Sequence, residues 1–167
     1  LMNRTAFDPD VEKSVAAILA EVRERGDEAV VEFAAQFDRA TLKPSRFRVT
    51  EEEIEDATSQ VDAATRKAIR RAQRQLKDFS TQSLPKPWSY TPRKGVVLGE
   101  RFAPMDRVGV YVPGGTAPLI STVLHTVTLA AVAGVEEIVV VTPPREDGSV
   151  HPAILYAART AGATEVY

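Results

Sequence analysis

The chain has 167 residues, a formal net charge of −2 and no cysteine. A chain of this length normally makes one domain, or one domain with a helical appendage. The balanced charge argues against nucleic acid or an anionic membrane as a partner, and the lack of cysteine excludes a disulfide framework. No stretch approaches the roughly 20 apolar residues of a membrane span, so we expect a cytoplasmic protein.

Apolar residues at helical spacing dominate the first part of the chain. Asp8 and Pro9 are typical of an N-cap and a first helical position, so a helix is expected from there until Gly26. A second helix is expected directly afterwards, from Asp27. The apolar faces of the two helices consist of Val11, Val15, Ile18, Leu19 and Val22, and of Val30, Val31, Phe33, Ala34 and Phe37.

Two further helices are expected before the chain reaches its proline-rich segment. Thr50 and Glu53 have the spacing of a capping box that opens a short acidic helix, and a longer helix is expected from Asp62 to about Phe79. One side of the longer helix is basic. A solvated face is the favoured interpretation and a nucleic-acid surface the minor one, because the chain has no net positive charge. The basic residues are Arg66, Lys67, Arg70, Arg71, Arg74 and Lys77.

A connector is expected between these helices and a sheet. The segment Ser83–Lys94 is rich in proline and contains Trp88 and Tyr90, so we interpret it as an extended connector that its aromatic side chains hold in place. Val96–Phe102 is expected to be extended, and Pro104 marks the start of the sheet domain. The predicted division is a helical region of residues 1–82, a connector of residues 83–106 and a nucleotide-binding type of α/β domain of residues 107–167.

Strands and helices alternate regularly through the last part of the chain, in the order βαβαβ. This order predicts an α/β fold with a partial Rossmann-like parallel sheet, truncated at its third strand. Right-handed crossovers place both connecting helices on one face. We expect the opposite face to be covered by the apolar stripes of the N-terminal helices, including the helix that carries Ile69 and Leu76. The expected elements are strands Val108–Val112 and Glu137–Val141, a strand beginning at Glu165, and helices near Pro118–Ala133 and Pro152–Ala161.

The loop after the first strand of this sheet is the expected ligand site. Pro113 removes an amide donor, and the pair Gly114-Gly115 permits a sharp turn with exposed backbone amides. Ligands of open α/β sheets bind outside the carboxyl ends of the strands, where such loops lead into helices. The spacing is neither that of a G-x-G-x-x-G motif nor that of a P-loop, so a plain tight turn is the alternative.

The sequence around this loop resembles a known family. The run Val-Gly-Val-Tyr-Val-Pro-Gly-Gly-Thr-Ala-Pro-Leu-Ile-Ser-Thr-Val-Leu, followed by Val-Ala-Gly-Val at 132–135 and Thr-Pro-Pro at 142–144, is similar to histidinol dehydrogenase. Weaker similarity extends back through the N-terminal helices. Essentially the whole chain therefore resembles the first part of that much longer enzyme.

The resemblance implies a zinc-containing, homodimeric enzyme of histidine biosynthesis. Such an enzyme oxidises L-histidinol through the aldehyde to L-histidine and reduces two NAD molecules. Its zinc ligands, its Glu–His acid/base pair and most of its substrate contacts are implied to lie in later sequence, some of them in the partner subunit. This chain is then expected to hold no catalytic and no metal-binding residue, and to be inactive by itself.

A few site residues are implied by matching the family motif residue by residue. Tyr111 matches a tyrosine that contacts NAD, and Pro113, Gly114 and Gly115 match the loop beside it. Ser121 matches the serine of the Ser-Thr pair, near the substrate. Two alternatives stay open: the tyrosine fills space beneath the following helix, or the hydroxyls of the Ser-Thr pair cap that helix.

The two histidines of the chain do not suggest a metal site. His125 lies within an apolar helix, where packing is the favoured interpretation. His151 precedes Pro152 at a helix start and is expected to be exposed. Thr128-Leu129-Ala130 replaces the family's usual Ile-Pro-Ala, so a related dehydrogenase of another amino alcohol or hydroxy compound is an alternative function. The other alternative function is that of a non-catalytic fragment that binds a nucleotide or a partner.

Overall fold

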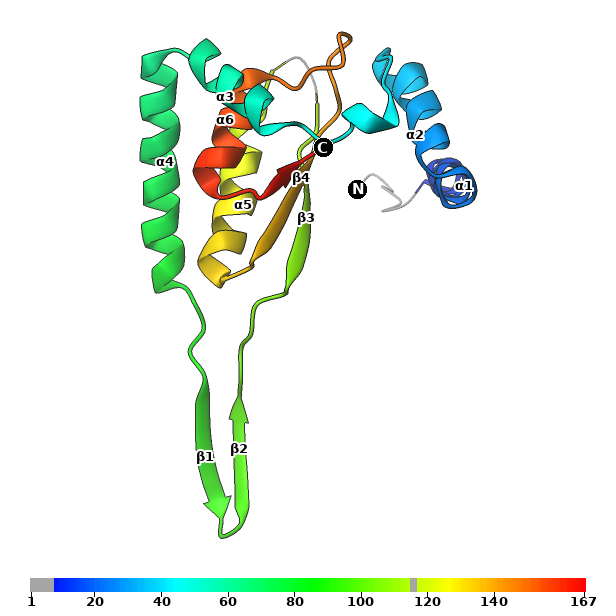
Figure 1. The fold of residues 1–167 in the computed structure, drawn as a ribbon. Coiled ribbons are helices and arrows are strands. Elements are labelled where there is room, and N and C mark those ends of the chain that lie inside the picture. The colour runs from blue at the N-terminus through cyan, green and yellow to red at the C-terminus, as the bar shows by residue number, and fades with distance from the viewer. Residues whose placement is uncertain (1–7, 115–116) are drawn as a thin grey trace, which may run out of the picture. The chain divides into compact units, whose positions relative to one another are not determined.

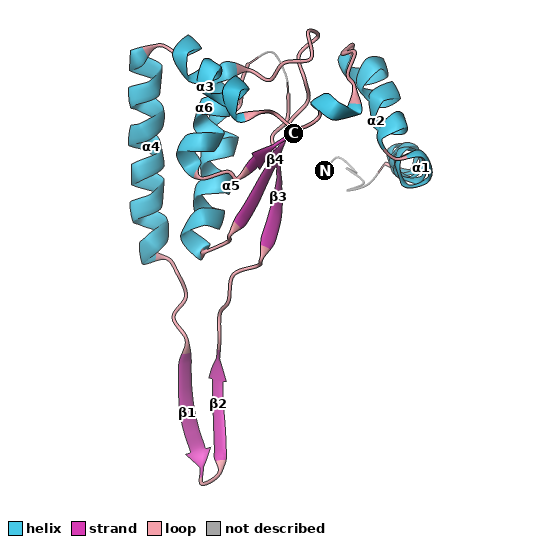
Figure 2. Cartoon of the chain, viewed as in Figure 1, coloured by secondary structure: helices cyan, strands magenta, loops and turns pink. Residues whose placement is uncertain are grey.

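The computed structural model of the protein describes residues 8–114 and 117–167. The chain divides into two compact units (Figure 1), and in both of them more residues lie in helices than in strands (Figure 2). The helical unit comprises Leu1–Phe47 with Pro144–Ser149, and the sheet unit comprises Arg48–Pro143 with Val150–Tyr167. The boundaries expected after residues 82 and 106 stay a prediction. Within the described ranges, no helix is both long and apolar enough to cross a membrane.

The helical unit begins as the sequence predicts. The side chain of Asp8 accepts a hydrogen bond from the backbone amide of Asp10 at 3.0 Å, and Pro9 opens the first helix. Gly26 separates the first two helices with a φ of 59° and a ψ of −132°, a conformation open essentially to glycine alone. The elements are α1 (Pro9–Arg25), α2 (Asp27–Phe33), a π-helical turn (Ala34–Asp38) and a 3₁₀ turn (Pro44–Arg46).

The sheet unit contains the predicted βαβαβ arrangement, which is therefore confirmed. Its three strands are parallel and stand in the order β3-β4-β5, so the sheet grows in one direction along the chain. Hydrogen bonding pairs Arg107 with Glu137 and Tyr111 with Val141. The elements are β3 (Arg107–Tyr111), α5 (Ile120–Ala133), β4 (Glu137–Val141), α6 (Pro152–Ala161) and β5 (Glu165–Val166).

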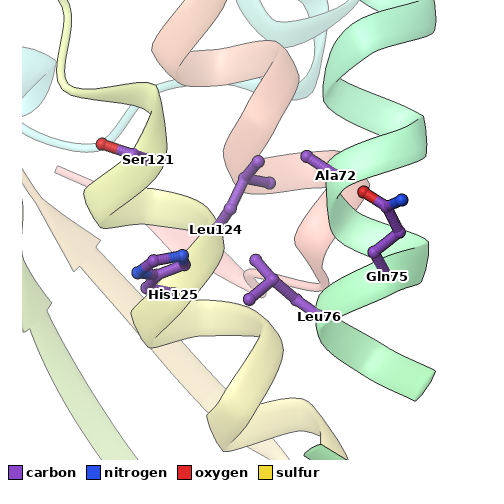
Figure 3. Close-up of a pocket in the computed structure, with 6 residues that line it drawn as sticks. All are labelled: Ala72, Gln75, Leu76, Ser121, Leu124 and His125. Atoms are coloured by element: carbon purple, nitrogen blue, oxygen red, sulfur yellow. The ribbon is translucent and has the colours of Figure 1, made fainter. Parts of the chain in front are cut away.

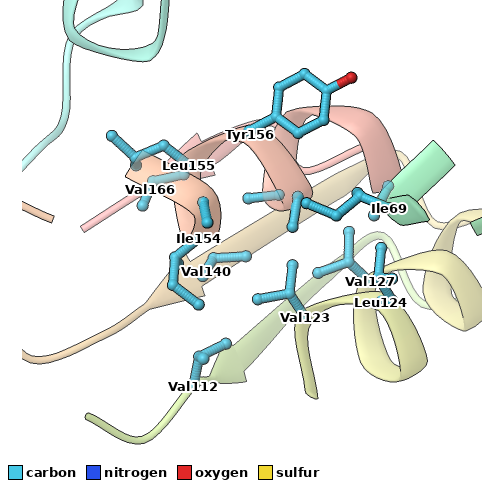
Figure 4. Close-up of a cluster of buried hydrophobic side chains, with 14 of the residues drawn as sticks. Ile69, Val112, Val123, Leu124, Val127, Val140, Ile154, Leu155, Tyr156 and Val166 are labelled. Carbon is cyan, nitrogen blue, oxygen red and sulfur yellow. The ribbon is translucent and has the colours of Figure 1, made fainter. Parts of the chain in front are cut away.

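One face of this sheet carries the hydrophobic core. Val110, Val140 and Val166 of the three strands belong to one buried cluster with Val123 and Val127 of α5 and Ile154 of α6. Figure 4 shows most of these side chains, with Val140 and Val166 directed toward the helices. Both crossover helices thus lie on the same face, as right-handed connections in one direction require. The residues that alternate with the core positions on β3 are Arg107, Gly109 and Tyr111, and all three are exposed.

A third layer of helices packs outside α5 and α6. The helix α4 (Ala63–Gln82) contacts both of them, and α3 (Glu51–Gln60) contacts α6. Ile69 of α4 is buried in the same core, with Leu76 partly buried against it. The expectation that the Ile69 and Leu76 stripe covers the opposite face of the sheet is therefore wrong. The physical reason is that α5 and α6 are apolar on more than one side. The apolar stripe of α4 is therefore buried against these helices and not against the sheet.

Side-chain caps fix where α3 and α4 begin. The amide of Glu53 donates to Thr50 Oγ1 at 3.2 Å, and the amide of Thr50 donates to Glu53 Oε2 at 2.8 Å, which confirms the capping box. At the next helix, the amide of Thr65 donates to Asp62 Oδ1 at 2.9 Å. Hydrogen bonds from Thr65 lower the pKa of the Asp62 carboxyl, because they favour its ionised form.

The predicted proline-rich connector is in fact a β-hairpin. The strands β1 (Trp88–Arg93) and β2 (Val96–Glu100) pair antiparallel, with a turn at Lys94-Gly95 where the glycine has a φ of 83°. Two aromatic residues were expected to hold the connector in place, but Trp88 and Tyr90 are 51% and 54% exposed. They stack on each other with ring centroids 6.0 Å apart, and Trp88 Nε1 donates to the side chain of Glu100 at 2.9 Å. The aromatic side chains therefore stabilise the hairpin itself.

Candidate functional site

The carboxyl ends of the three strands meet at one edge of the sheet. Beyond the last paired residues of β3 and β4, the amide of Val112 donates to the carbonyl of Val141 at 2.8 Å. In the same way, the amide of Thr142 donates to the carbonyl of Tyr167 at 2.9 Å. These hydrogen bonds extend the pairing to the carboxyl ends of the strands, so the strands end at the same edge. The loops that follow β3 and β4 therefore leave the sheet side by side.

Tyr111 is the last residue of β3, and its side chain is exposed. Its neighbours Val110 and Val112 are 9% and 0% exposed and point into the core beneath α5. Because successive side chains of a strand point to opposite faces, the ring of Tyr111 lies on the other face, where it is 64% exposed. The alternative that this tyrosine fills space beneath the following helix is therefore wrong.

The loop after β3 runs against the loop after β4. A Cβ atom built on Gly114 would lie 3.2 Å from the side chain of Pro143, tighter than an ordinary contact. A side chain at position 114 would push these two loops apart. Pro113 is partly buried beside Gly114. Gly115, the remaining predicted loop residue, lies outside the described residues.

The start of α5 uses no side-chain cap. Leu119 holds the N-cap position and makes no side-chain hydrogen bond to the helix amides. Ser121 and Thr122 both lie inside the first turn of α5, so the alternative that they cap the helix is wrong. Ser121 is instead exposed on the side of α5 that faces α4. The structure does not bring it together with Tyr111, which lies on the far face of the sheet.

Ser121 lines a hollow between two parallel-running helices, which we call the α4–α5 groove (Figure 3). The groove has a volume of about 330 Å³. His125 is exposed at its rim and is not packed in the core, contrary to expectation. Amphipathic patterning alone could not have revealed the groove, because it depends on which helices become neighbours. Its lining consists of Ala72, Gln75, Leu76, Ser121, Leu124 and His125.

The carboxylates near the sheet have structural partners. Arg107 at the start of β3 contacts Glu137 at 3.2 Å and Glu165 at 2.9 Å, which ties together the amino ends of the three strands. His151 is exposed, as expected, and its Nδ1 accepts a hydrogen bond from the amide of Ala153 at 3.1 Å. Over residues 8–114 and 117–167, no group of three or more His, Cys, Asp or Glu side chains could hold a metal ion. The described residues therefore do not fit a zinc site.

Comparison with known proteins identifies the family. The family model described as histidinol dehydrogenase matches residues 2–167. A histidinol dehydrogenase of Symbiobacterium thermophilum is 46% identical over 164 residues, which are 98% of this chain and 37% of that protein. One of Methanosarcina barkeri is 43% identical over 168 residues, 100% of this chain and 38% of that protein.

Comparison with a solved structure shows that the fold is also that of histidinol dehydrogenase. The crystal structure of histidinol dehydrogenase from Elizabethkingia anophelis superposes with a TM-score of 0.90 at 31% identity, covering 99% of this chain and 37% of that one. The chain thus spans less than two fifths of the length of these relatives. Together with the strand-end tyrosine and its Pro-Gly loop, these matches show that the chain belongs to the histidinol dehydrogenase family.

Proposed function

We propose that this chain forms the cofactor-binding part of an NAD-dependent dehydrogenase that oxidises L-histidinol to L-histidine in histidine biosynthesis. The observation that carries the proposal is the exposed ring of Tyr111 at the carboxyl end of β3, beside a loop that a side chain at position 114 would disturb. The substrate, L-histidinol, is inferred from membership of the histidinol dehydrogenase family. The reaction belongs to cytoplasmic amino-acid biosynthesis, consistent with the lack of cysteine in the chain.

The residues of the strand end suit a dinucleotide. The ring of Tyr111 offers an apolar face for an adenine or ribose, and its hydroxyl can donate or accept a hydrogen bond. Gly114 leaves the backbone of the loop open to close approach, with Pro113 beside it. Gly115 is proposed as a cofactor-binding residue from the family motif alone. When bound, NAD accepts hydride from the substrate. The part played by these residues is to bind and orient the cofactor at the edge of the sheet.

We propose that the zinc ligands and the acid/base pair lie in the part of such an enzyme that this chain does not cover, and that a second subunit contributes some of them. The described residues form no metal site, so no step of the reaction is assigned to zinc through them. Relatives are more than twice as long as this chain, which leaves room for those groups beyond the matched part. We also propose, from the resemblance to the family, that the enzyme is a homodimer. A substrate role for Ser121 rests on the resemblance alone, because its side chain lines the α4–α5 groove.

A different substrate is the weaker proposal. The departure from the family pattern at Thr128-Leu129 lies well inside α5, where Thr128 is buried and Leu129 is 46% exposed. Neither residue belongs to the loop after β3. The departure therefore affects helix packing first, and L-histidinol remains the better candidate over another amino alcohol or hydroxy compound.

The experiment compares the intact protein with residues 1–167 alone. With L-histidinol, NAD and zinc, the intact protein is expected to form NADH, and the 167-residue chain to form none above the blank. The reason is that the chain's described part offers no metal site. The resemblance to the family further implies that the acid/base pair lies in later sequence. NADH formation by the short chain would contradict the assignment of catalysis to later sequence. Faster turnover of another amino alcohol than of L-histidinol would favour the alternative substrate.

A further inference from the structure

Two consecutive prolines make the start of the loop after β4 stiff. Pro143 and Pro144 have no backbone amide, and the ring of each fixes its φ. Because Pro143 itself precedes a proline, its ψ is restricted as well. The residue before the pair, Thr142, is tied to the sheet by the hydrogen bond from its amide to the carbonyl of Tyr167 at 2.9 Å. Pro143 is therefore a rigid group that begins directly at the edge of the sheet.

The ring of Pro143 lies against the backbone of Gly114. A Cβ atom built on Gly114 would have its three nearest neighbours in this ring, Cγ at 3.2 Å, Cβ at 3.3 Å and Cδ at 3.7 Å. The first two distances are shorter than ordinary van der Waals contact, which begins at 3.4 Å. A flexible side chain could turn away from an added methyl group, whereas a proline ring is closed onto the backbone and cannot. This contact therefore needs a residue without a side chain at position 114.

The φ angle of Gly114 does not itself require glycine. This φ lies outside the left-handed region that residues with a side chain rarely adopt. Gly95 at the hairpin turn is the opposite case, because its φ is 83° and no atom lies within 4 Å of an added Cβ. The glycine at position 95 thus serves the conformation of the chain, whereas the glycine at position 114 makes room for the ring of Pro143.

The contact holds the loop after β3 close to the point where it leaves the sheet. The amide of Val112 donates to the carbonyl of Val141 at 2.8 Å, and Gly114 follows two residues later. Pro113, which lies between them, has no amide with which to continue this pairing. Packing against Pro143 therefore takes over from hydrogen bonding as the support of the loop backbone.

We propose that Pro143 is a positioning residue for the cofactor and that it acts through Gly114. Its ring holds the loop after β3 in the position from which the loop backbone binds NAD. This role rests on the proposed cofactor site at Tyr111. A loop that is already held in its binding conformation gives a higher affinity, because the ligand does not have to order it. Loosening or displacing the loop is therefore expected to weaken the binding of NAD.

The test measures the KM for NAD in three variants of the intact protein, with L-histidinol saturating. Pro143→Gly removes the ring, and the KM is expected to rise about two- to fivefold, the equivalent of the restriction that one proline places on a chain. Gly114→Ala adds a methyl group against the ring, and the KM is expected to rise about fivefold or more. The double variant has no ring for the methyl group to meet. Its KM is therefore expected to equal that of Pro143→Gly alone, instead of showing the product of the two effects.

Pro144→Gly is the matched control for the double variant. It removes the adjacent proline, which supplies none of the three atoms nearest to the added Cβ, so it should not lower the KM of Gly114→Ala. If the methyl group at position 114 met the cofactor itself, Pro143→Gly would not lower the KM either, and that result would overturn the proposal. An equal rescue by Pro144→Gly would also overturn it.

Two comparisons separate positioning from other causes. A change that only destabilises the protein reduces the amount of active enzyme, and hence the turnover, without raising the KM for NAD. A raised KM in Tyr111→Ala, with unchanged values in the Pro143 and Gly114 variants, would reject the positioning role and leave the proposed cofactor site in place. If Gly114→Ala fails to fold, Pro143→Gly decides by itself, because a KM equal to that of the wild type would contradict the proposal.

Discussion

Replacing Tyr111 by alanine in the intact protein tests the cofactor site directly. The ring is 64% exposed, so only about a third of it is removed from water by folding. Full burial of a large apolar side chain stabilises by about 1.5–3 kcal/mol, so the free energy of unfolding should fall by no more than about 1 kcal/mol. The variant is therefore expected to fold, and its kinetic defect can be interpreted as a loss of binding.

The expected kinetic defect is a higher KM for NAD. An aromatic ring stacked on a base contributes about 1–3 kcal/mol by alanine substitution. That loss corresponds to about a 5-fold to 150-fold higher KM. The turnover number should stay within a few-fold of wild type, because the lost contact binds ground state and transition state alike. Steady-state NADH formation at saturating L-histidinol, with NAD varied, measures both parameters.

Two controls separate the ring from its surroundings. Tyr90→Ala removes a tyrosine of similar exposure, 54%, from the hairpin and should leave the KM for NAD unchanged. Tyr111→Phe keeps the ring and loses only the hydroxyl, so its KM should rise by about fivefold or less, the equivalent of one net hydrogen bond. An unchanged KM in Tyr111→Ala, or an equal rise in Tyr90→Ala, would refute the assignment of this ring to the cofactor.

Three further predictions concern the support of the site. Thr50→Ala removes the capping box of α3 and should lower the free energy of unfolding by about 1 kcal/mol in urea titrations, whereas an unchanged midpoint would show that the cap is dispensable. The carboxyl of Asp62 has a lowered pKa in the folded chain, so its stabilising effect is present at neutral pH and is lost as the pH falls below its ordinary value toward the folded one. Urea midpoints of wild type and Asp62→Ala should therefore converge in acid, and a constant difference would contradict this. Gly99→Val should disrupt the hairpin, since a Cβ there would lie 2.2 Å from the carbonyl oxygen of Trp88; fluorescence of Trp88, the single tryptophan of these 167 residues, reports it, and an unchanged spectrum would contradict the hairpin register.

Features set by neighbours in the sequence were predictable. The start of α1 at Asp8 and Pro9 and the capping box at Thr50 depend on residues two or three positions apart, so they can be identified from the sequence alone. The alternation of strands and helices from Arg107 onward was predictable for a similar reason, because apolar runs and turn residues mark each element. The direction of sheet growth then followed from the handedness of crossovers.

Features that depend on contacts between residues far apart in the sequence could not be predicted. The stripe at Ile69 and Leu76 indicates that α4 buries one side, but it does not say against which surface. In the structure that surface is formed by α5 and α6. The hairpin was missed because proline suggested a connector, although the turn glycine Gly95, between the aromatic pair Trp88 and Tyr90 and the β-branched pair Val96 and Val97, was a usable signal. The exposure of the Tyr111 ring was left open by the sequence, which allowed either a contact with the cofactor or packing beneath the following helix. A strand buried on both faces was expected, whereas only the face of Val110 and Val112 is covered by α5.

The most direct test of the proposed function is the stoichiometry of NAD reduction by the intact protein. With limiting L-histidinol and excess NAD, two molecules of NADH are expected for each molecule of L-histidinol consumed, with L-histidine as the product, because the alcohol passes through the aldehyde to the acid. One NADH per substrate with accumulation of an aldehyde, or no NADH at all, would contradict the assignment.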